Sequence, residues 1–176
     1  MSLVGQRFEA GDYYLAELLL AAEIFKAAVA QLTPHLPSST SQHSAGKVVL
    51  ATMRGDIHDL GKNIVATLLR AHAFEVHDLG VNVEPAALVE AVRRVRPEFV
   101  GMSVLITTAF ESMKQACRLL ADAGLRDSVR VMIGGGVTTP ELREWLGADF
   151  QTHDAAAGVS YCLAEVGQRT GRSNDV

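Results

Sequence analysis

Residues 47–65 read KVVLATMRGDIHDLGKNIV, and this stretch decides the fold. Residues 47–53 form a nearly continuous apolar run, which is typical of a strand buried on both faces of a parallel sheet. A helix is expected over 61–73. The polar turn between them then lies at the carboxyl end of the strand, where open α/β sheets bind their ligands.

Strands and helices alternate through the rest of the chain. Further strands are expected at 74–80, 99–105, 129–135 and 148–153. Further helices are expected at 85–96, 109–123, 139–146 and 155–168. Strict alternation predicts the α/β class, with a flavodoxin-like, doubly wound, five-stranded parallel sheet covered by helices on both faces.

The first part of the chain has a different pattern. A full helix is expected over 13–32, with room for a partial one over 2–9. Its apolar side chains recur at steps of three and four, in the order Leu15, Leu18, Leu19, Ala22, Phe25, Val29, Leu32. Pro34 and Pro37 end it. The predicted domains are therefore a helical cap (1–36), a polar linker (37–46) and an α/β domain (47–176).

Composition excludes several classes of protein. Hydrophobic residues make up 48% and charged residues 20%, so the chain has enough apolar material for a core. A net charge of −4 argues against a nucleic-acid partner. No apolar run is long enough for a membrane span, and the N-terminus does not resemble a signal peptide. Cys117 and Cys162 lie in apolar helical patterns and are expected to be buried free thiols, as in a cytoplasmic protein.

Three short motifs stand at the ends of predicted strands. Asp56, His58 and Gly61 form DxHxxG after the first strand, and Ser103 and Leu105 form SxL at the end of the third. A third motif, the pair Gly134–Gly135, ends the fourth strand. Each fragment alone is a weak signal. At matching loops of one parallel sheet they indicate a single ligand site.

Together these motifs resemble the signature of the cobalamin-binding domain shared by methionine synthase, several mutases and the small corrinoid proteins of methyltransferase systems. The flanking stretches DIHDLGKNIV, VHDLGVNV and SVLITT resemble the methyl-carrying branch. The upstream stretch is similar to the end of that branch's helical cap, so the resemblance covers nearly the whole chain. The family's cap is usually a four-helix bundle, and residues 1–36 are too short for one. A short (truncated) cap is therefore expected, either natural to the protein or the result of a missing upstream segment.

The resemblance implies a cobalamin cofactor, such as methylcobalamin, hydroxocobalamin or a related corrinoid. It implies that His58 is the axial cobalt ligand and replaces the cofactor's own benzimidazole, the base-off/His-on arrangement. Asp56 would accept a hydrogen bond from the other ring nitrogen of His58, which fixes the tautomer of a metal-bound histidine. Ser103 would in turn hydrogen-bond Asp56, and the three would form a relay.

The remaining cofactor contacts are also implied by the resemblance. Near the corrin or its nucleotide tail these are Asp59, Gly61, Leu105, Thr107, Thr108, Gly134 and Gly135. The glycines would leave room for the displaced tail. Tyr14, with Ala21 and Ile24 on one helical face, would cover the upper corrin face. Ordinary core packing is the alternative role of Tyr14.

The implied work is methyl transfer by a carrier subunit without independent catalysis, cycling between Co(I) and methyl-Co(III). The implied partners are a substrate-specific methyltransferase, a methyl-acceptor methyltransferase and a reductive reactivation protein, with no nucleic acid and no membrane. Because one amphipathic helix cannot bury its apolar stripe alone, the stripe is expected to pair with a second chain or to pack on the corrin and the sheet. The hypothesis is a homodimer through residues 1–36.

Two other functions use the same architecture. One is a light-responsive sensor of adenosylcobalamin, whose cap carries a tryptophan and a Glu-His pair; here Trp145 is far from the cap and Ile24 follows Glu23. The other is cofactor storage or delivery. Among different site chemistries, a His-Asp phosphohydrolase conflicts with the strand pattern, and an Asp56 phosphoacceptor leaves His58 unexplained. GGGVTT does not complete a dinucleotide-binding motif. His35, His43 and His153 are expected to be solvated.

Overall fold

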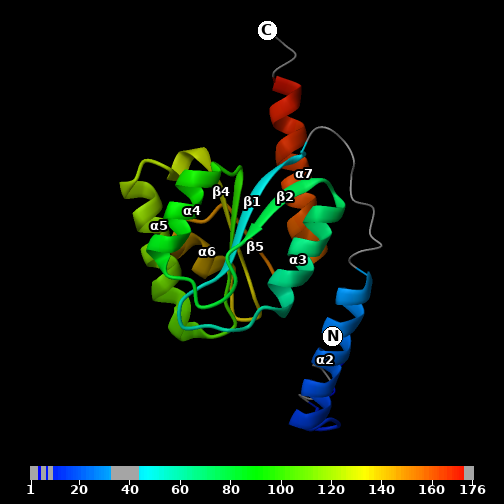
Figure 1. Cartoon of the computed structure of the whole chain (residues 1–176). Coiled ribbons are helices and arrows are strands. Elements are labelled where there is room, and N and C mark those ends of the chain that lie inside the picture. Colours follow the sequence, from blue (N-terminus) through cyan, green and yellow to red (C-terminus); the bar gives the residue numbers. More distant parts are fainter. Residues whose placement is uncertain (1–3, 5–6, 8–9, 33–43, 173–176) are drawn as a thin grey trace. The chain divides into compact units, whose positions relative to one another are not determined.

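The computed structural model describes residues 4, 7, 10–32 and 44–172 of the chain (Figure 1). It divides into two compact units, Met1–Pro37 and Ser38–Val176. His35 and His43 lie outside the described residues, as does most of the predicted linker. No helix in the described ranges is long and apolar enough to cross a membrane.

The second unit is built on a five-stranded parallel sheet. Its strands are β1 (Gly46–Thr52), β2 (Phe74–Asp78), β3 (Phe99–Ser103), β4 (Arg130–Gly134) and β5 (Phe150–Thr152). Their order is β2-β1-β3-β4-β5, and every neighbouring pair is parallel. This is the doubly wound order of flavodoxin-like folds, so the predicted fold is confirmed.

Helices cover both faces of the sheet (Figure 1). They are α3 (Leu60–Ala71), α4 (Pro85–Val95), α5 (Phe110–Asp122), α6 (Pro140–Leu146) and α7 (Ala155–Arg172). The apolar cores that they bury show that α3 and α7 cover one face, and that α4, α5 and α6 cover the other. Two short 3-10 turns, η2 (Thr107–Ala109) and η3 (Arg126–Ser128), precede α5 and β4.

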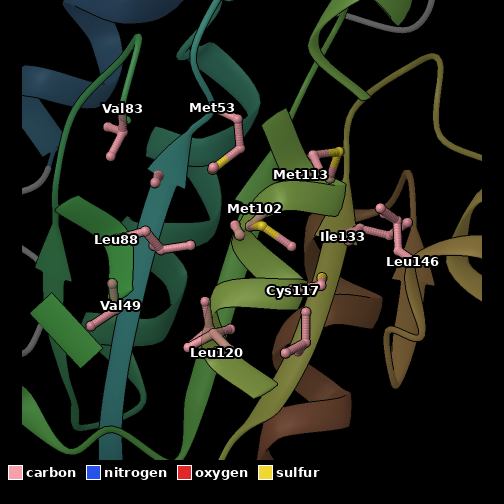
Figure 2. Packing of buried hydrophobic residues seen from close by; sticks show 14 of the residues in the cluster. Val49, Met53, Val83, Leu88, Met102, Met113, Cys117, Leu120, Ile133 and Leu146 are labelled. Atoms are coloured by element: carbon pink, nitrogen blue, oxygen red, sulfur yellow. The ribbon is translucent and has the colours of Figure 1, made fainter. Parts of the chain in front are cut away.

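Successive side chains along each strand point to opposite faces of the sheet, and the apolar ones form two cores. In β1, Val49 points to the α4, α5 and α6 face, where it packs in a cluster with Leu88, Met113 and Leu146 (Figure 2). Val48 and Leu50 point to the α3 and α7 face. Cys117 and Cys162 are buried free thiols as predicted, one in each core, and burial raises the pKa of Cys162 to about 12.

Every strand ends one or two residues before its predicted end. The predicted ends at 53, 80, 105, 135 and 153 become 52, 78, 103, 134 and 152. At these positions the chain leaves the ladder and turns, as shown by the positive φ angles of Gly55, Gly80 and Gly135. The apolar residues just beyond the strands therefore belong to the loops that form the carboxyl edge.

The first unit contains α2 (Leu15–Leu32), which begins two residues later than predicted. Tyr14 stands just before its first residue, and the Tyr14 N–H donates to Glu17 Oε2 at 3.0 Å. This is half of a capping box, so the helix starts where the Tyr14 N–H finds a side-chain acceptor. Leu20, Ile24 and Leu32 are exposed on this helix.

Candidate functional site

His58 and Asp56 form a close pair in the loop between β1 and α3. Nδ1 of His58 lies 2.6 Å from Asp56 Oδ1, and the His58 N–H donates to the same oxygen at 2.9 Å. The Asp56 side chain is fully buried, whereas that of His58 is 53% exposed. A carboxylate next to Nδ1 places the ring proton there, so Nε2 presents its lone pair on a half-exposed ring.

The surroundings of Asp56 keep it ionised. Burial is the largest influence and would raise the pKa of this carboxyl group. Hydrogen bonds from the Leu105 N–H, the His58 N–H and the His58 ring act together in the opposite direction, and the pKa falls below the ordinary value of 3.8. Asp56 is therefore a charged acceptor at neutral pH.

The hydrogen bond expected from Ser103 to Asp56 is not formed. Asp56 Oδ2 accepts instead from the backbone N–H of Leu105, in a very short hydrogen bond, and from that of Ile106 at 3.3 Å. Ser103 is the last residue of β3 and pairs in register with Thr52. The chain bends just after it, and this bend aims two backbone donors at the carboxylate.

Thr52 is a site residue that the sequence analysis missed. Its buried hydroxyl donates to the carbonyl oxygen of His58 at 2.9 Å and so fixes the backbone of the histidine. A hydroxyl in the apolar run 47–53 was the available signal, because a polar group on a buried strand needs a hydrogen-bond partner.

Small side chains line one face of the sheet at its carboxyl edge. Four residues stand in register across neighbouring strands: Thr52, Ser103, Gly134 and Thr152. By strand alternation they share the α3 and α7 face with Val48, Phe99, Met132 and Phe150. This end of the face therefore carries much less side-chain volume than the core beneath it.

The predicted site glycines differ in their surroundings. A Cβ at Gly61, in the first turn of α3, would meet no atom within 4 Å. One at Gly134 would lie 3.2 Å from the carbonyl oxygen of Thr152. Gly135 has φ +110°, and a Cβ there would collide with the backbone of Val104. Gly135 is thus required by the packing of the protein's own loops, which the sequence analysis did not foresee.

Apolar and hydroxyl side chains are exposed in the same loops. Ile57, the residue after Asp56, is 73% exposed, and Leu105, whose N–H donates to the Asp56 carboxylate, is 43% exposed. Thr107 and Thr108 are exposed in the η2 turn that follows. Exposed apolar side chains next to an imidazole suit a flat, largely apolar ligand.

A polar network ties the start of α3 to the end of β2. Asp59 Oδ2 accepts from Asn63 Nδ2 at 3.0 Å, and Lys62 Nζ donates to Asn63 Oδ1 at 2.8 Å. Lys62 is buried and donates to both carboxylate oxygens of Asp78, at 2.6 and 2.7 Å. The sequence analysis did not single out Lys62 or Asp78.

The remaining predicted residues lie elsewhere. Tyr14 is 75% exposed in the first unit, which the structure describes separately from the sheet. His153 is exposed at the end of β5, and its Nε2 lies 2.6 Å from the carbonyl oxygen of Thr138. Within the described ranges, no group of three or more His, Cys, Asp and Glu side chains is placed to hold a metal ion.

Comparison with known proteins identifies the family. Residues 46–159 match the family model described as B12 binding domain, and residues 1–33 match a second model with the same description. Over 160 residues the chain is 38% identical to the dimethylamine corrinoid protein of Methanosarcina barkeri, covering 91% of this chain and 75% of that protein.

Two solved structures are similar over almost the whole chain. The monomethylamine corrinoid protein of Methanosarcina barkeri is 32% identical with a TM-score of 0.80, over 93% of this chain and 77% of the other. A chain of the methanol:cobalamin methyltransferase complex from the same organism is 25% identical with a TM-score of 0.68, over 94% and 63%. The protein therefore belongs to the B12-binding domain family, and its cofactor is a corrinoid of the cobalamin class.

Proposed function

We propose that this chain is the methyl-carrying corrinoid protein of a methyltransferase system, with His58 as the lower axial ligand of the cobalt. The observation that carries the proposal is the pair in which a buried, ionised Asp56 holds Nδ1 of a half-exposed His58. Histidines that bind metals ordinarily donate their second ring N–H to a carboxylate in this way. Nε2 would take the place of the cofactor's benzimidazole.

The row of small side chains fits the displaced nucleotide tail. Thr52, Ser103 and Gly134 place small side chains at the carboxyl edge on the α3 and α7 face, and a Cβ at Gly61, in the first turn of α3, would meet open space. The hydroxyl of Ser103 is available to the tail rather than to Asp56. Ile57 and Leu105 would contact the underside of the corrin ring.

When bound, the corrinoid supplies a cobalt centre that accepts a methyl group from one partner and yields it to another. The residues of the chain provide the ligand and hold the ring proton on His58 Nδ1, against Asp56. Thr52 fixes the histidine backbone, so the imidazole needs little reorganisation on ligation. A corrin ring supplies most of the ligands of its own cobalt, so the protein needs to contribute only one imidazole.

The proposed partners are a substrate-specific methyltransferase, a methyl-acceptor methyltransferase and a reductive reactivation protein. Support comes from the relatives, one of which belongs to a methanol:cobalamin methyltransferase complex and another of which is a dimethylamine corrinoid protein. We further propose that residues 1–36 cap the upper corrin face, with Tyr14 over the cofactor, and that the cap pairs with that of a second copy.

Substitution of His58 tests the proposed ligation. His58→Ala removes the only side chain that the proposal gives to the cobalt. We expect the wild type to take up hydroxocobalamin in a 1:1 ratio with a protein nitrogen on the metal. We expect the variant to hold the cofactor without that ligand and at least ten times more weakly. EPR spectra of 15N-labelled protein, recorded after one-electron reduction of the cofactor, show whether the protein supplies the nitrogen, and equilibrium dialysis measures the ratio and the affinity.

His72→Ala is the matched control, because His72 is exposed at the other end of α3 and bonds the Leu68 carbonyl. It should behave as the wild type. Equal spectra and affinities for His58→Ala and the wild type would refute the ligand assignment. A wild type that binds no corrinoid would refute the whole proposal.

A further inference from the structure

The loop that carries Asp56 and His58 opens with a tight turn from Met53 to Asp56. The Asp56 N–H donates to the Met53 carbonyl at 3.0 Å, and Gly55 has φ +92°. Among the described non-glycine residues, positive φ angles occur at Ala73, Asn82 and Arg96, and therefore not at Arg54. The turn is thus of type II, in which the third residue takes a left-handed φ.

Asn82, in the loop after β2, holds this turn from both sides. Its Oδ1 accepts from the Gly55 N–H at 2.8 Å, and its own N–H donates to the Asp56 carbonyl at 3.0 Å. Asn82 has φ +52°, a conformation that asparagine tolerates better than most residues. One residue therefore contacts the turn on either side of the peptide that joins Gly55 to Asp56.

The neighbouring residues bring Asn82 to this position. The Val83 N–H donates to the Thr52 carbonyl at 3.0 Å, and the Arg54 N–H donates to the Val83 carbonyl at 2.9 Å. These two bonds, with the parallel bridge between Met53 and Val83, continue the pairing of β1 and β2 beyond the strand ends. Residues 82 and 83 thus form a short extension of the sheet against the turn.

We propose that Asn82 is a positioning residue that fixes the Arg54–Gly55 peptide and so sets Asp56 and His58 for ligation of the cofactor. Turn types I and II differ by a flip of this central peptide. The flip would turn the Gly55 N–H away from Asn82 Oδ1 and break the hydrogen bond between them. The Asn82 side chain holds that N–H and stabilises the type II form. This inference rests on the proposed role of His58.

Two substitutions at position 82 separate the side chain from the backbone. Asn82→Gly keeps the left-handed backbone and removes the acceptor, whereas Asn82→Asp keeps an acceptor oxygen. Arg96→Gly is the matched control, because Arg96 has φ +51° at the end of α4, away from the carboxyl edge, and gains the same backbone freedom. Each variant is made in the full chain.

The first readout is amide hydrogen exchange at Gly55 in the cofactor-free protein. A lost hydrogen bond corresponds to a change of about threefold to tenfold, so we expect Gly55 in Asn82→Gly to exchange faster by this factor. Asn82→Asp should stay within about twofold of the wild type, a difference smaller than one hydrogen bond. Exchange at Gly55 as slow in Asn82→Gly as in the wild type and in Arg96→Gly would overturn the inference.

The second readout is the ratio of cobalt with a protein nitrogen ligand to cobalt without one. It is read from the EPR spectrum of 15N-labelled protein after hydroxocobalamin is bound and reduced by one electron. A 15N ligand from the protein splits the lines into doublets, whereas the 14N of the cofactor's benzimidazole gives triplets. We expect the ratio to fall about threefold to tenfold in Asn82→Gly and to recover in Asn82→Asp. An unchanged ratio despite faster Gly55 exchange would overturn the positioning role. A wild type without a protein nitrogen ligand would overturn the proposed function, whereas the exchange comparison alone decides whether Asn82 holds the turn.

Discussion

Asp56 is a buried carboxylate whose two oxygens both face hydrogen-bond donors. Oδ1 receives the N–H and ring nitrogen of His58, and Oδ2 receives the N–H groups of Leu105 and Ile106. In Asp56→Asn the side-chain NH2 group would take the place of one of these oxygens. It would face N–H donors, and those donors would lose their acceptor. We expect Asp56→Asn to lower the free energy of unfolding of the cofactor-free protein by about 1–3 kcal/mol at pH 7. Urea denaturation measures this, with exposed Asp127→Asn as the control.

The same variant has a pH signature. Because the pKa of Asp56 is lower in the folded state, its ionisation stabilises the protein above the ordinary carboxyl pKa of 3.8, and this stabilisation is lost as the pH falls through the folded value. The difference in unfolding free energy between wild type and Asp56→Asn should therefore shrink as the pH falls below 3.8. A difference that is constant down to acid pH would contradict a charged Asp56.

For single residues, the sequence predicts contacts between side chains better than contacts with the backbone. The pairing of Asp56 with His58 is visible in the DxH spacing, because a side chain two positions away in a tight loop can reach the ring. The donors from Leu105 and Ile106 are not visible, since every residue except proline carries a backbone N–H. Their direction is set by a bend of the chain after β3.

Among the elements, α3 and β2 are joined by an ion pair in which the lysine is buried and the aspartate is partly exposed. The Lys62 side chain is 3% exposed and that of Asp78 is 22% exposed, with 2.6 Å between Nζ and Oδ2. Lys62→Met would leave the Asp78 carboxylate partly buried without its cation. We expect a loss of about 3 kcal/mol in unfolding free energy, measured by chemical denaturation, and partial recovery in the double variant Lys62→Met/Asp78→Asn.

The control for this prediction is a second pair that also involves β2. Lys47 and Glu75 are 3.9 Å apart, and their side chains are 44% and 47% exposed. Lys47→Met should cost less than about 1 kcal/mol, because solvent screens an exposed pair. A similar loss for Lys47→Met and Lys62→Met would show that the buried pair contributes no special stability.

The sequence predicts the elements well and their ends less well. The apolar runs predicted strands that continue through Met53 and Leu105, but β1 and β3 end at Thr52 and Ser103. An apolar side chain fits either a strand or the rim of an apolar ligand site. The hydrophobic pattern alone therefore does not show where the strand gives way to the site.

At the scale of the whole molecule, the apolar helix α2 predicts self-association. Leu20 and Ile24 are each 61% exposed and lie four residues apart, on one face of the helix. We expect light scattering at tens of micromolar to give the mass of a dimer. Leu20→Glu/Ile24→Glu should give the mass of a monomer, because charges on this face oppose pairing.

Leu163→Glu, on the exposed surface of α7, is the control and should keep the dimer mass. A wild type that scatters as a monomer, with or without corrinoid, would exclude the pairing of caps. The result is independent of the His58 experiments.

Strict alternation of strands and helices was enough to predict the doubly wound sheet, because parallel pairing and right-handed crossovers leave few other arrangements. The contact between the loops after β1 and β2, through Asn82, was not predicted. It depends on a left-handed residue and on pairing that continues past two strand ends.

The Asp56 carboxylate is held by an amide that comes 49 residues later in the chain. While the polypeptide is still emerging from the ribosome, the histidine loop is made well before the segment that immobilises it. Strands β2 and β3, which flank β1 in the sheet, lie between these two segments in the chain and must also be synthesised and paired with β1. If His58 binds the cofactor as proposed, the fully positioned imidazole would therefore form only after residue 105 has been synthesised, because the Leu105 N–H is one of the donors that hold Asp56.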